Sequence, residues 1–171
     1  EQGDNEIIPP YESLKKFIPP DKLWPINDAW YFHAGSSDGN NSLRNIQHVI
    51  DRRYGPAHSA EEFAGKAQLA AYENLRAQFE DFAANGWADH KMTIYWMLNN
   101  HWPSFFGHIF DYYLKPGGAY FGAKMGLKPL SVVFDYYAKD ARQGNIRVVN
   151  QTLQDRSGLQ VRVRIYDLDG K

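Results

Sequence analysis

The chain has 171 residues, of which 43% are hydrophobic, 15% aromatic and 23% charged. Its 19 basic and 20 acidic side chains give a formal net charge of -1, which argues against a basic nucleic-acid surface and a polybasic membrane patch. Cysteine is absent, which excludes disulfides, thiolate metal sites and cysteine nucleophiles. No apolar run approaches the roughly 20 residues that cross a bilayer. The composition is typical of a globular protein with an aromatic-rich core or a stacking surface.

Residues 1–39 predict little regular structure, because prolines interrupt them and only residues 12–17 suggest a short helix. Loops of this length are typically functional or disordered. The aromatic side chains of residues 24–32 favour an ordered, packed loop. The chain opens with neither Met nor a signal peptide, so we expect a piece of a longer protein.

Three helices are predicted after this loop. Residues 42–54 place apolar side chains on one face, and Gly55 follows as a C-terminal cap. The sequence Ser-Ala-Glu-Glu at 59–62 is a capping box, and it opens a long helix that ends at residues 85–86 (Asn-Gly). Residues 119–126 predict the third helix.

The apolar run at residues 92–98 (MTIYWML) predicts a strand that is buried on both faces, as in a parallel sheet. Polar and aromatic residues follow it directly at 99–102 (NNHW). An α/β barrel places its active site at the C-terminal ends of its parallel strands. The sequence therefore indicates a functional site after residue 98.

Past Pro129 the pattern changes from helical spacing to alternation, which is typical of half-buried strands. Strands are predicted at residues 131–137, 145–151 and 159–167, with a turn at 169–170 (Asp-Gly). This change predicts a domain boundary between residues 128 and 129.

Several stretches, in this order, resemble one known family: YWMLNNHWPS (95–104), HIFDYYLKPGGAYFGAKMGLKPL (108–130), VVNQT (148–152) and YDLDGK (166–171). They are similar to the end of the catalytic barrel of a family 2 glycoside hydrolase and the start of its next domain. The exo-β-D-glucosaminidases resemble the chain most, within the branch that also holds β-mannosidases and plant endo-β-mannosidases. The resemblance implies an α/β fold in which residues 1–128 form the C-terminal portion of a (β/α)8 TIM barrel, from the end of strand 7 to helix 8. Residues 129–171 would begin an immunoglobulin-like β-sandwich.

The resemblance also implies a catalytic residue. Glu1 matches the nucleophile of the family, with residues 8–9 (Ile-Pro) and 12–14 (Glu-Ser-Leu) in register behind it. A retaining glycosidase uses two carboxylates about 5–5.5 Å apart, one as nucleophile and one as acid and base. The second carboxylate would lie upstream of this chain, so we expect the chain alone to be inactive.

Three of the substrate-binding residues implied by the resemblance lie within residues 96–100. Trp96 matches a tryptophan on which the sugar stacks, and the alternative is core packing. Asn99 and Asn100 either donate hydrogen bonds to sugar hydroxyls or simply end the strand.

Three further residues would border the same pocket. Trp102 either flanks the leaving-group side or packs its own loop. Trp30 and His33 lie in the loop that follows the nucleophile. For both, a structural role is the alternative to substrate contact.

The expected function is therefore that of a retaining β-glycoside hydrolase that removes glucosamine- or mannose-type sugars from oligosaccharides. The alternatives are a non-catalytic carbohydrate-binding or structural module, and an endo-β-mannosidase acting on glycoprotein glycans. We expect no cofactor and no metal, since the carboxylate pair suffices and the six histidines lack a ligand spacing. The expected partners are an oligosaccharide or glycan and the remainder of the barrel, with no nucleic acid and no membrane. The location stays open, with secretion or the periplasm expected for the parent protein.

Overall fold

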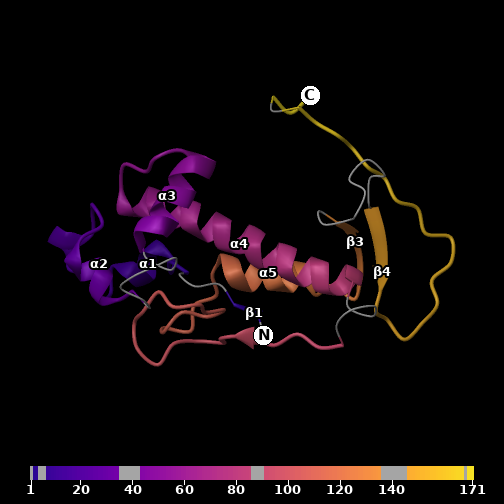
Figure 1. Ribbon diagram of the computed structural model, residues 1–171, viewed down its shortest axis with the longest axis horizontal. Helices are drawn as coiled ribbons and strands as arrows, with labels where there is room; N and C mark the ends of the chain where they lie inside the picture. Colours follow the sequence, from indigo (N-terminus) through magenta and orange to yellow (C-terminus); the bar gives the residue numbers. More distant parts are fainter. Residues whose placement is uncertain (1, 4–6, 35–42, 86–90, 136–145, 168) are drawn as a thin grey trace. The chain divides into compact units, whose positions relative to one another are not determined.

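The structure is a computed structural model, and it describes residues 2–3, 7–34, 43–85, 91–135, 146–167 and 169–171 (Figure 1). The chain divides into two compact units, Glu1–Leu127 and Lys128–Lys171. The first unit contains, in chain order, β1 (Gln2–Gly3), α1 (Tyr11–Leu14), the 3₁₀ helix η1 (Pro20–Lys22), α2 (Asp28–Phe32), α3 (Leu43–Tyr54), α4 (Ala60–Asn85), β2 (Tyr95–Trp96) and α5 (Gly118–Gly126). The second contains β3 (Leu130–Phe134) and β4 (Ile146–Asn150). None of the helices in these ranges is long and apolar enough to cross a membrane.

The strands β1 and β2 pair in parallel, with Gln2 opposite Tyr95 and Gly3 opposite Trp96. Parallel strands cannot be joined by a tight turn, so the chain crosses between them through the helices, of which α4 is the longest. This crossover brings the beginning of the chain beside the strand that was predicted to precede the functional site.

The apolar run at residues 92–98 is more exposed than the sequence predicted. Alternate side chains on one face are more than half exposed: Met92 (71%), Ile94 (55%), Trp96 (53%) and Leu98 (65%). Tyr95 points the other way and packs on the core beside α4 and α5. The prediction of a strand buried on both faces is therefore wrong for this structure, because one face has no covering layer among the described residues.

The helices α3 and α4 confirm the predicted helices and their ends. Gly55 follows α3 with a φ of +78°, a left-handed conformation that favours glycine. At the start of α4 the Glu62 N–H donates to Ser59 Oγ (3.1 Å). The Glu62 carboxylate accepts from the His58 N–H (2.8 Å), so the capping box forms with the glutamate reaching one residue further back.

The helix α5 confirms the third predicted helix and packs closely along α4 (Figure 1). Three glycines spaced four residues apart face α4, namely Gly118, Gly122 and Gly126. A Cβ added at Gly126 would lie 2.9 Å from the Arg76 carbonyl oxygen, and at the other two it would lie closer still to α4 carbonyls. The two helix backbones therefore touch along a row where any larger residue would collide.

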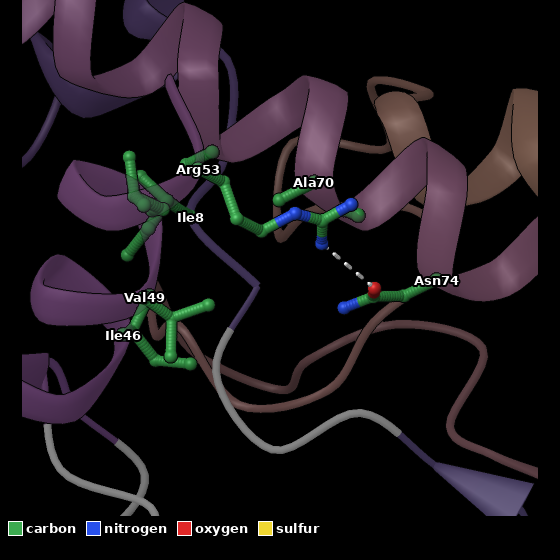
Figure 2. A pocket seen from close by; sticks show the side chains of 9 residues that line it. Ile8, Ile46, Val49, Arg53, Ala70 and Asn74 are labelled. Carbon is green, nitrogen blue, oxygen red and sulfur yellow. Dashed lines mark hydrogen bonds between the residues drawn. The ribbon is translucent and has the colours of Figure 1, made fainter. Parts of the chain in front are cut away.

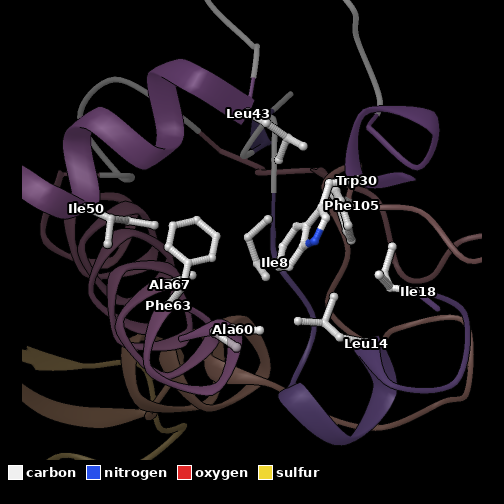
Figure 3. Packing of buried hydrophobic residues seen from close by; sticks show 11 residues of the cluster. Ile8, Leu14, Ile18, Trp30, Leu43, Ile50, Ala60, Phe63, Ala67 and Phe105 are labelled. Carbon is white, nitrogen blue, oxygen red and sulfur yellow. The ribbon is translucent and has the colours of Figure 1, made fainter. Parts of the chain in front are cut away.

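Two hydrophobic clusters form the core of the first unit. The first surrounds α1 to α3 and the N-terminal half of α4, and consists of Ile8, Leu14, Ile18, Trp30, Leu43, Ile50, Ala60, Phe63, Ala64, Ala67 and Phe105 (Figure 3). The second lies between α4 and α5 and consists of Ile7, Ala71, Leu75, Phe79, Ala119 and Ala123. Ile7 and Ile8 are consecutive, and each belongs to a different cluster, as expected when neighbouring side chains of an extended segment point to opposite sides.

The second unit contains an antiparallel pair, β3 and β4, in the register Leu130 opposite Asn150 to Phe134 opposite Ile146. Over their described residues these strands confirm two of the three predicted strands. The third prediction, at 159–167, is wrong for this structure. A strand needs a neighbouring backbone to pair with, and none of the described residues pairs with this segment. The predicted turn is present, with the Gly170 N–H donating to the Asp167 carbonyl (3.1 Å).

Candidate functional site

The predicted site residues are spread over the first unit, and one of them cannot be placed. Glu1 lies outside the described residues. Trp96 ends β2 opposite Gly3, and its side chain is 53% exposed. Its indole is therefore available for stacking on the face of β2 that carries no covering layer within the described ranges. The peptide bond from Trp96 to Met97 is cis.

The segment after β2 folds back on itself. The Met97 N–H donates to the Gly107 carbonyl (2.8 Å), and the Phe110 N–H donates to the Leu98 carbonyl (2.9 Å). Asn99 forms a parallel bridge with Phe110, and its side chain is exposed. The result is a turn at residues 100–105, held at its base, with the Asn99 amide free to face solvent.

Asn100, by contrast, is only 3% exposed, and its side chain forms hydrogen bonds inside the turn. Its Nδ2 donates to the Ser104 carbonyl (3.2 Å) and lies 2.9 Å from His108 Nδ1. A carbonyl only accepts, so the amide nitrogen must face Ser104, and its second proton then points to His108. In this structure the Asn100 side chain therefore bonds to protein groups at the end of the strand, which favours the structural alternative over a bond to a sugar hydroxyl.

His33 and Trp102 come together although 69 residues separate them in the chain. Their rings stack with centroids 5.3 Å apart and planes inclined by 27°. His33 Nδ1 lies 2.5 Å from the Pro103 carbonyl oxygen, which fixes the proton on Nδ1. In the neutral ring, Nε2 is then left as an acceptor.

Phe32, which the sequence reasoning missed, extends this aromatic group. Its ring is 72% exposed and stands edge-on to His33 (5.2 Å, 87°) and to Trp102 (5.7 Å, 84°). The aromatic group of Phe32, His33 and Trp102 joins the end of α2 to the turn after β2. Rings that are partly exposed and held in place are suited to stacking on the apolar face of a sugar.

Trp30 does not join this group, which corrects the expectation that it borders a sugar pocket. It is fully buried in the first cluster and packs against Phe63 and Phe105 (Figure 3). Its Nε1 donates to the carbonyls of Lys22 (3.3 Å) and Leu23 (3.1 Å). A side chain that has no exposed surface and whose N–H already donates to backbone carbonyls cannot contact a substrate.

Two buried polar residues were also missed, His108 and Asp111, each 2% exposed. Burial lowers the pKa of His108 to about 4, while the nearby Asp111 carboxylate and a backbone hydrogen bond at Phe106 act in the opposite direction. Asp111 Oδ1 accepts from the N–H groups of Tyr113 and Lys115 (2.9 Å each). The sequence signal for both is a polar residue within an otherwise apolar and aromatic stretch.

A pocket lies elsewhere in the unit, between α3, α4 and the segment at Ile8 (Figure 2). It is lined by Ile8, Ile46, Val49, Ile50, Arg53, Ala67, Ala70, Ala71 and Asn74. Arg53 at its edge donates to Asn74 (3.5 Å) and pairs with the Glu73 carboxylate. None of the predicted site residues lines it, and the lining holds no acid, so it is not suited to acid–base chemistry. Among the described residues, no group of three or more His, Asp or Glu side chains is placed to hold a metal ion.

Comparison with known proteins adds the functional context. No protein-family model matches the chain. The exo-β-D-glucosaminidase of Amycolatopsis orientalis is 36% identical over 169 residues, which cover 95% of this chain and 16% of that protein. The enzyme of the same name from Hypocrea jecorina is 36% identical over 177 residues, covering 100% and 19%. The mannosylglycoprotein endo-β-mannosidase of Lilium longiflorum is 26% identical over 147 residues, covering 84% and 14%.

Solved structures agree with this result. The exo-chitosanase CsxA of Amycolatopsis orientalis superposes with a TM-score of 0.73 at 33% identity, covering 86% of this chain and 18% of that one. The β-D-mannosidase of Dictyoglomus thermophilum gives the same TM-score at 24% identity, covering 90% and 18%, and supports the fold alone.

Fold and sequence together therefore define the class: the chain is similar to part of a glycoside hydrolase. The chain belongs to family 2 of these enzymes, and its relatives include exo-β-D-glucosaminidases and a mannosylglycoprotein endo-β-mannosidase, which confirms the resemblance. It spans less than a fifth of the length of each of these relatives.

Proposed function

We propose that these residues are part of a retaining β-glycoside hydrolase that removes glucosamine- or mannose-type sugars from oligosaccharides. The observation that carries this proposal is the 36% identity to an exo-β-D-glucosaminidase over 95% of the chain. The related exo-chitosanase CsxA has been solved in complex with PNP-β-D-glucosamine. An aryl β-glucosaminide is therefore the first substrate to test.

In this proposal residues 1–128 supply the end of strand 7 to helix 8 of a (β/α)8 barrel, and residues 129–171 begin an immunoglobulin-like sandwich. The parallel pairing of β1 with β2, joined by a helical crossover, supports the barrel assignment. The antiparallel pair β3–β4 supports the second assignment. The uncovered face of β2 would then point into the barrel.

The proposed reaction is a double displacement in which Glu1 attacks the anomeric carbon. An acid contributed by residues outside this chain protonates the departing oxygen, and the same group then removes a proton from the water that releases the sugar. Because two carboxylates are required, we expect the 171 residues by themselves to be inactive. The register that sets Gly3 opposite Trp96 supports a common pocket for the start of the chain and the end of β2.

Among the side chains assigned to the sugar, the exposed ones are the best candidates. Trp96 would form a stacking surface, and the Asn99 amide would bind a hydroxyl. His33 and Trp102 would contact the leaving-group side as one stacked pair. Asn100 and Trp30 would support these contacts from the interior.

A second candidate is a non-catalytic carbohydrate-binding module. The exposed Trp96 and the aromatic group of Phe32, His33 and Trp102 favour it, because such surfaces bind sugars without any acid. The similarity to an endo-β-mannosidase keeps endo action on glycoprotein glycans as a further variant of the enzyme.

The test is a panel of aryl β-glucosaminide, β-mannoside and β-galactoside, offered to the longest gene product that contains these residues. A Glu1→Gln version serves as the matched comparison. Turnover of one substrate that disappears in the Gln version supports the proposal and identifies the sugar. No turnover, or full activity of Glu1→Gln, contradicts it, and sugar affinity of Trp102→Ala would then test the binding module.

A further inference from the structure

The buried polar group of Asn100, Ser104, His108 and Asp111 has no assigned role in the proposed reaction. Asn99 and Phe110 form a parallel bridge, so Asn100 and Asp111, which follow them, leave the bridge on the same side. All four members are at most 5% exposed. The group therefore lies directly beneath the turn that carries Trp102.

Within this group the Asn100 side chain has only one way to be oriented. Its two Nδ2 protons are both used, one by the Ser104 carbonyl and one by His108 Nδ1. Its Oδ1 is buried and has no donor among the described residues. Among the described residues, these two acceptors determine the orientation of the amide, and the bond to Ser104 ties residue 100 to the far end of the turn.

His108 can accept from Asn100 only while its ring is neutral at Nδ1. Burial lowers the pKa of the imidazole to about 4, against the smaller opposing effects of the Asp111 carboxylate and of a backbone hydrogen bond at Phe106. At neutral pH the ring is therefore an acceptor, and the hydrogen bond to Asn100 persists.

The other side of the same turn is held by His33. The His33 Nδ1–H donates to the Pro103 carbonyl (2.5 Å), and the Phe105 N–H donates to the His33 carbonyl (2.9 Å). The turn that carries Trp102 is thus fixed in two ways. His33 bonds to it directly, and His108 bonds to Asn100, which in turn bonds to Ser104.

We propose that His108 is a positioning residue of the sugar site: as a neutral acceptor it orients Asn100, which closes the turn that presents Trp102. This inference rests on the proposed function, because the positioned indole matters only if it contacts a sugar. It assigns no chemical step to His108.

The test compares three variants of the longest gene product: His108→Leu, which removes the acceptor, His108→Asn, whose amide oxygen can replace Nδ1, and His101→Leu. His101 is exposed in the same turn and is the matched control. We expect His108→Leu to raise the KM for an aryl glycoside about tenfold with less than about a threefold loss of kcat. His108→Asn should restore KM to within about threefold, and His101→Leu should not change it.

Hydrogen exchange of the amides of residues 101–105 gives a readout that does not require activity. We expect faster exchange in His108→Leu than in His101→Leu, with His108→Asn close to the unmodified protein. Should His108→Leu fail to fold, Asn100→Asp takes its place, because an aspartate cannot donate to Ser104 or to His108.

The outcomes separate the two proposals. A wild-type KM in a folded His108→Leu protein, or unchanged exchange of residues 101–105, overturns the positioning role. A KM equally raised in His108→Asn and His108→Leu also overturns it. If the unmodified protein turns over no glycoside, the proposed function fails, and the exchange experiment alone decides whether His108 fixes the turn.

Discussion

Gln68, in the middle of α4, accepts a hydrogen bond from the backbone N–H of Gly118, the first residue of α5 (2.6 Å). The same side chain donates through Nε2 to the carbonyl of Ile8. One amide therefore joins three parts of the first unit: the segment after β1, the long helix and the last helix. No apolar side chain can make both bonds, so this position requires a side chain that both donates and accepts.

Replacing Gln68 by leucine should lower the free energy of unfolding by about 2–4 kcal/mol, because it leaves two backbone groups without partners at about 1–3 kcal/mol each. Urea denaturation of the longest gene product measures this loss. Gln160→Leu, at an exposed position, is the control and should be nearly neutral. A Gln68→Leu protein as stable as the control would contradict the bridging role.

The glycine row of α5 gives a second prediction. Gly122→Ala places a Cβ against the α4 backbone and should destabilise by about 1–3 kcal/mol, although alanine is the better helix former. Gly65→Ala in α4 is the matched substitution, since a Cβ there meets nothing within 4 Å. It should stabilise by about 0.5–1 kcal/mol. Opposite signs in urea denaturation confirm the close packing, and equal signs refute it.

The buried His108 predicts a pH dependence of stability. Its pKa is about 4 in the folded protein and 6.5 in the reference state, so between these values the unfolded chain binds the extra proton. Stability should therefore fall as the pH drops from about 6.5 to 4, by about 3 kcal/mol in total.

This contribution is isolated by comparing His108→Asn with His101→Asn over the same pH range. The His108→Asn protein should lose this part of the slope, and the His101→Asn protein should keep it. Identical slopes in the two variants would mean that His108 is accessible to protons in the folded state.

The two tryptophans near the candidate site should behave differently. Trp102→Ala should raise the KM for an aryl glycoside about tenfold, the equivalent of about 1.4 kcal/mol of lost stacking, and should leave the melting temperature nearly unchanged. Trp30→Ala should instead cost about 3–5 kcal/mol of stability, because it empties part of the core. Thermal melts and steady-state kinetics of both variants decide this, and a reversed pattern would exchange their roles.

The parts of the fold that sequence predicted well are those determined by local chemistry. The Ser59–Glu62 capping box and the glycine after α3 act within a few residues of themselves, so the boundaries of α3 and α4 could be predicted. The predictions that failed depend on distant neighbours. Whether residues 92–98 and 159–167 are covered or paired depends on chain that lies alongside them, and a local pattern carries no information about it.

The candidate site shows the same division. The residue types around Trp96 and Trp102 predicted the region of the candidate site, but only the exposure of the side chains in the structure distinguishes Trp102 from the buried Trp30. The contact between His33 and Trp102 spans 69 positions and has no local signature. The glycine spacing of α5 was visible in the sequence, yet only the closeness of α4 explains it.

The side-by-side residues Ile7 and Ile8 have a consequence for how the first unit unfolds. Each residue belongs to a different cluster, and one peptide bond joins the two residues. We therefore expect that opening one cluster displaces a side chain of the other. The amides of α3 and α5, which face separate clusters, should therefore exchange with the same opening free energy and behave as one cooperative unit. We therefore expect the two clusters to unfold together.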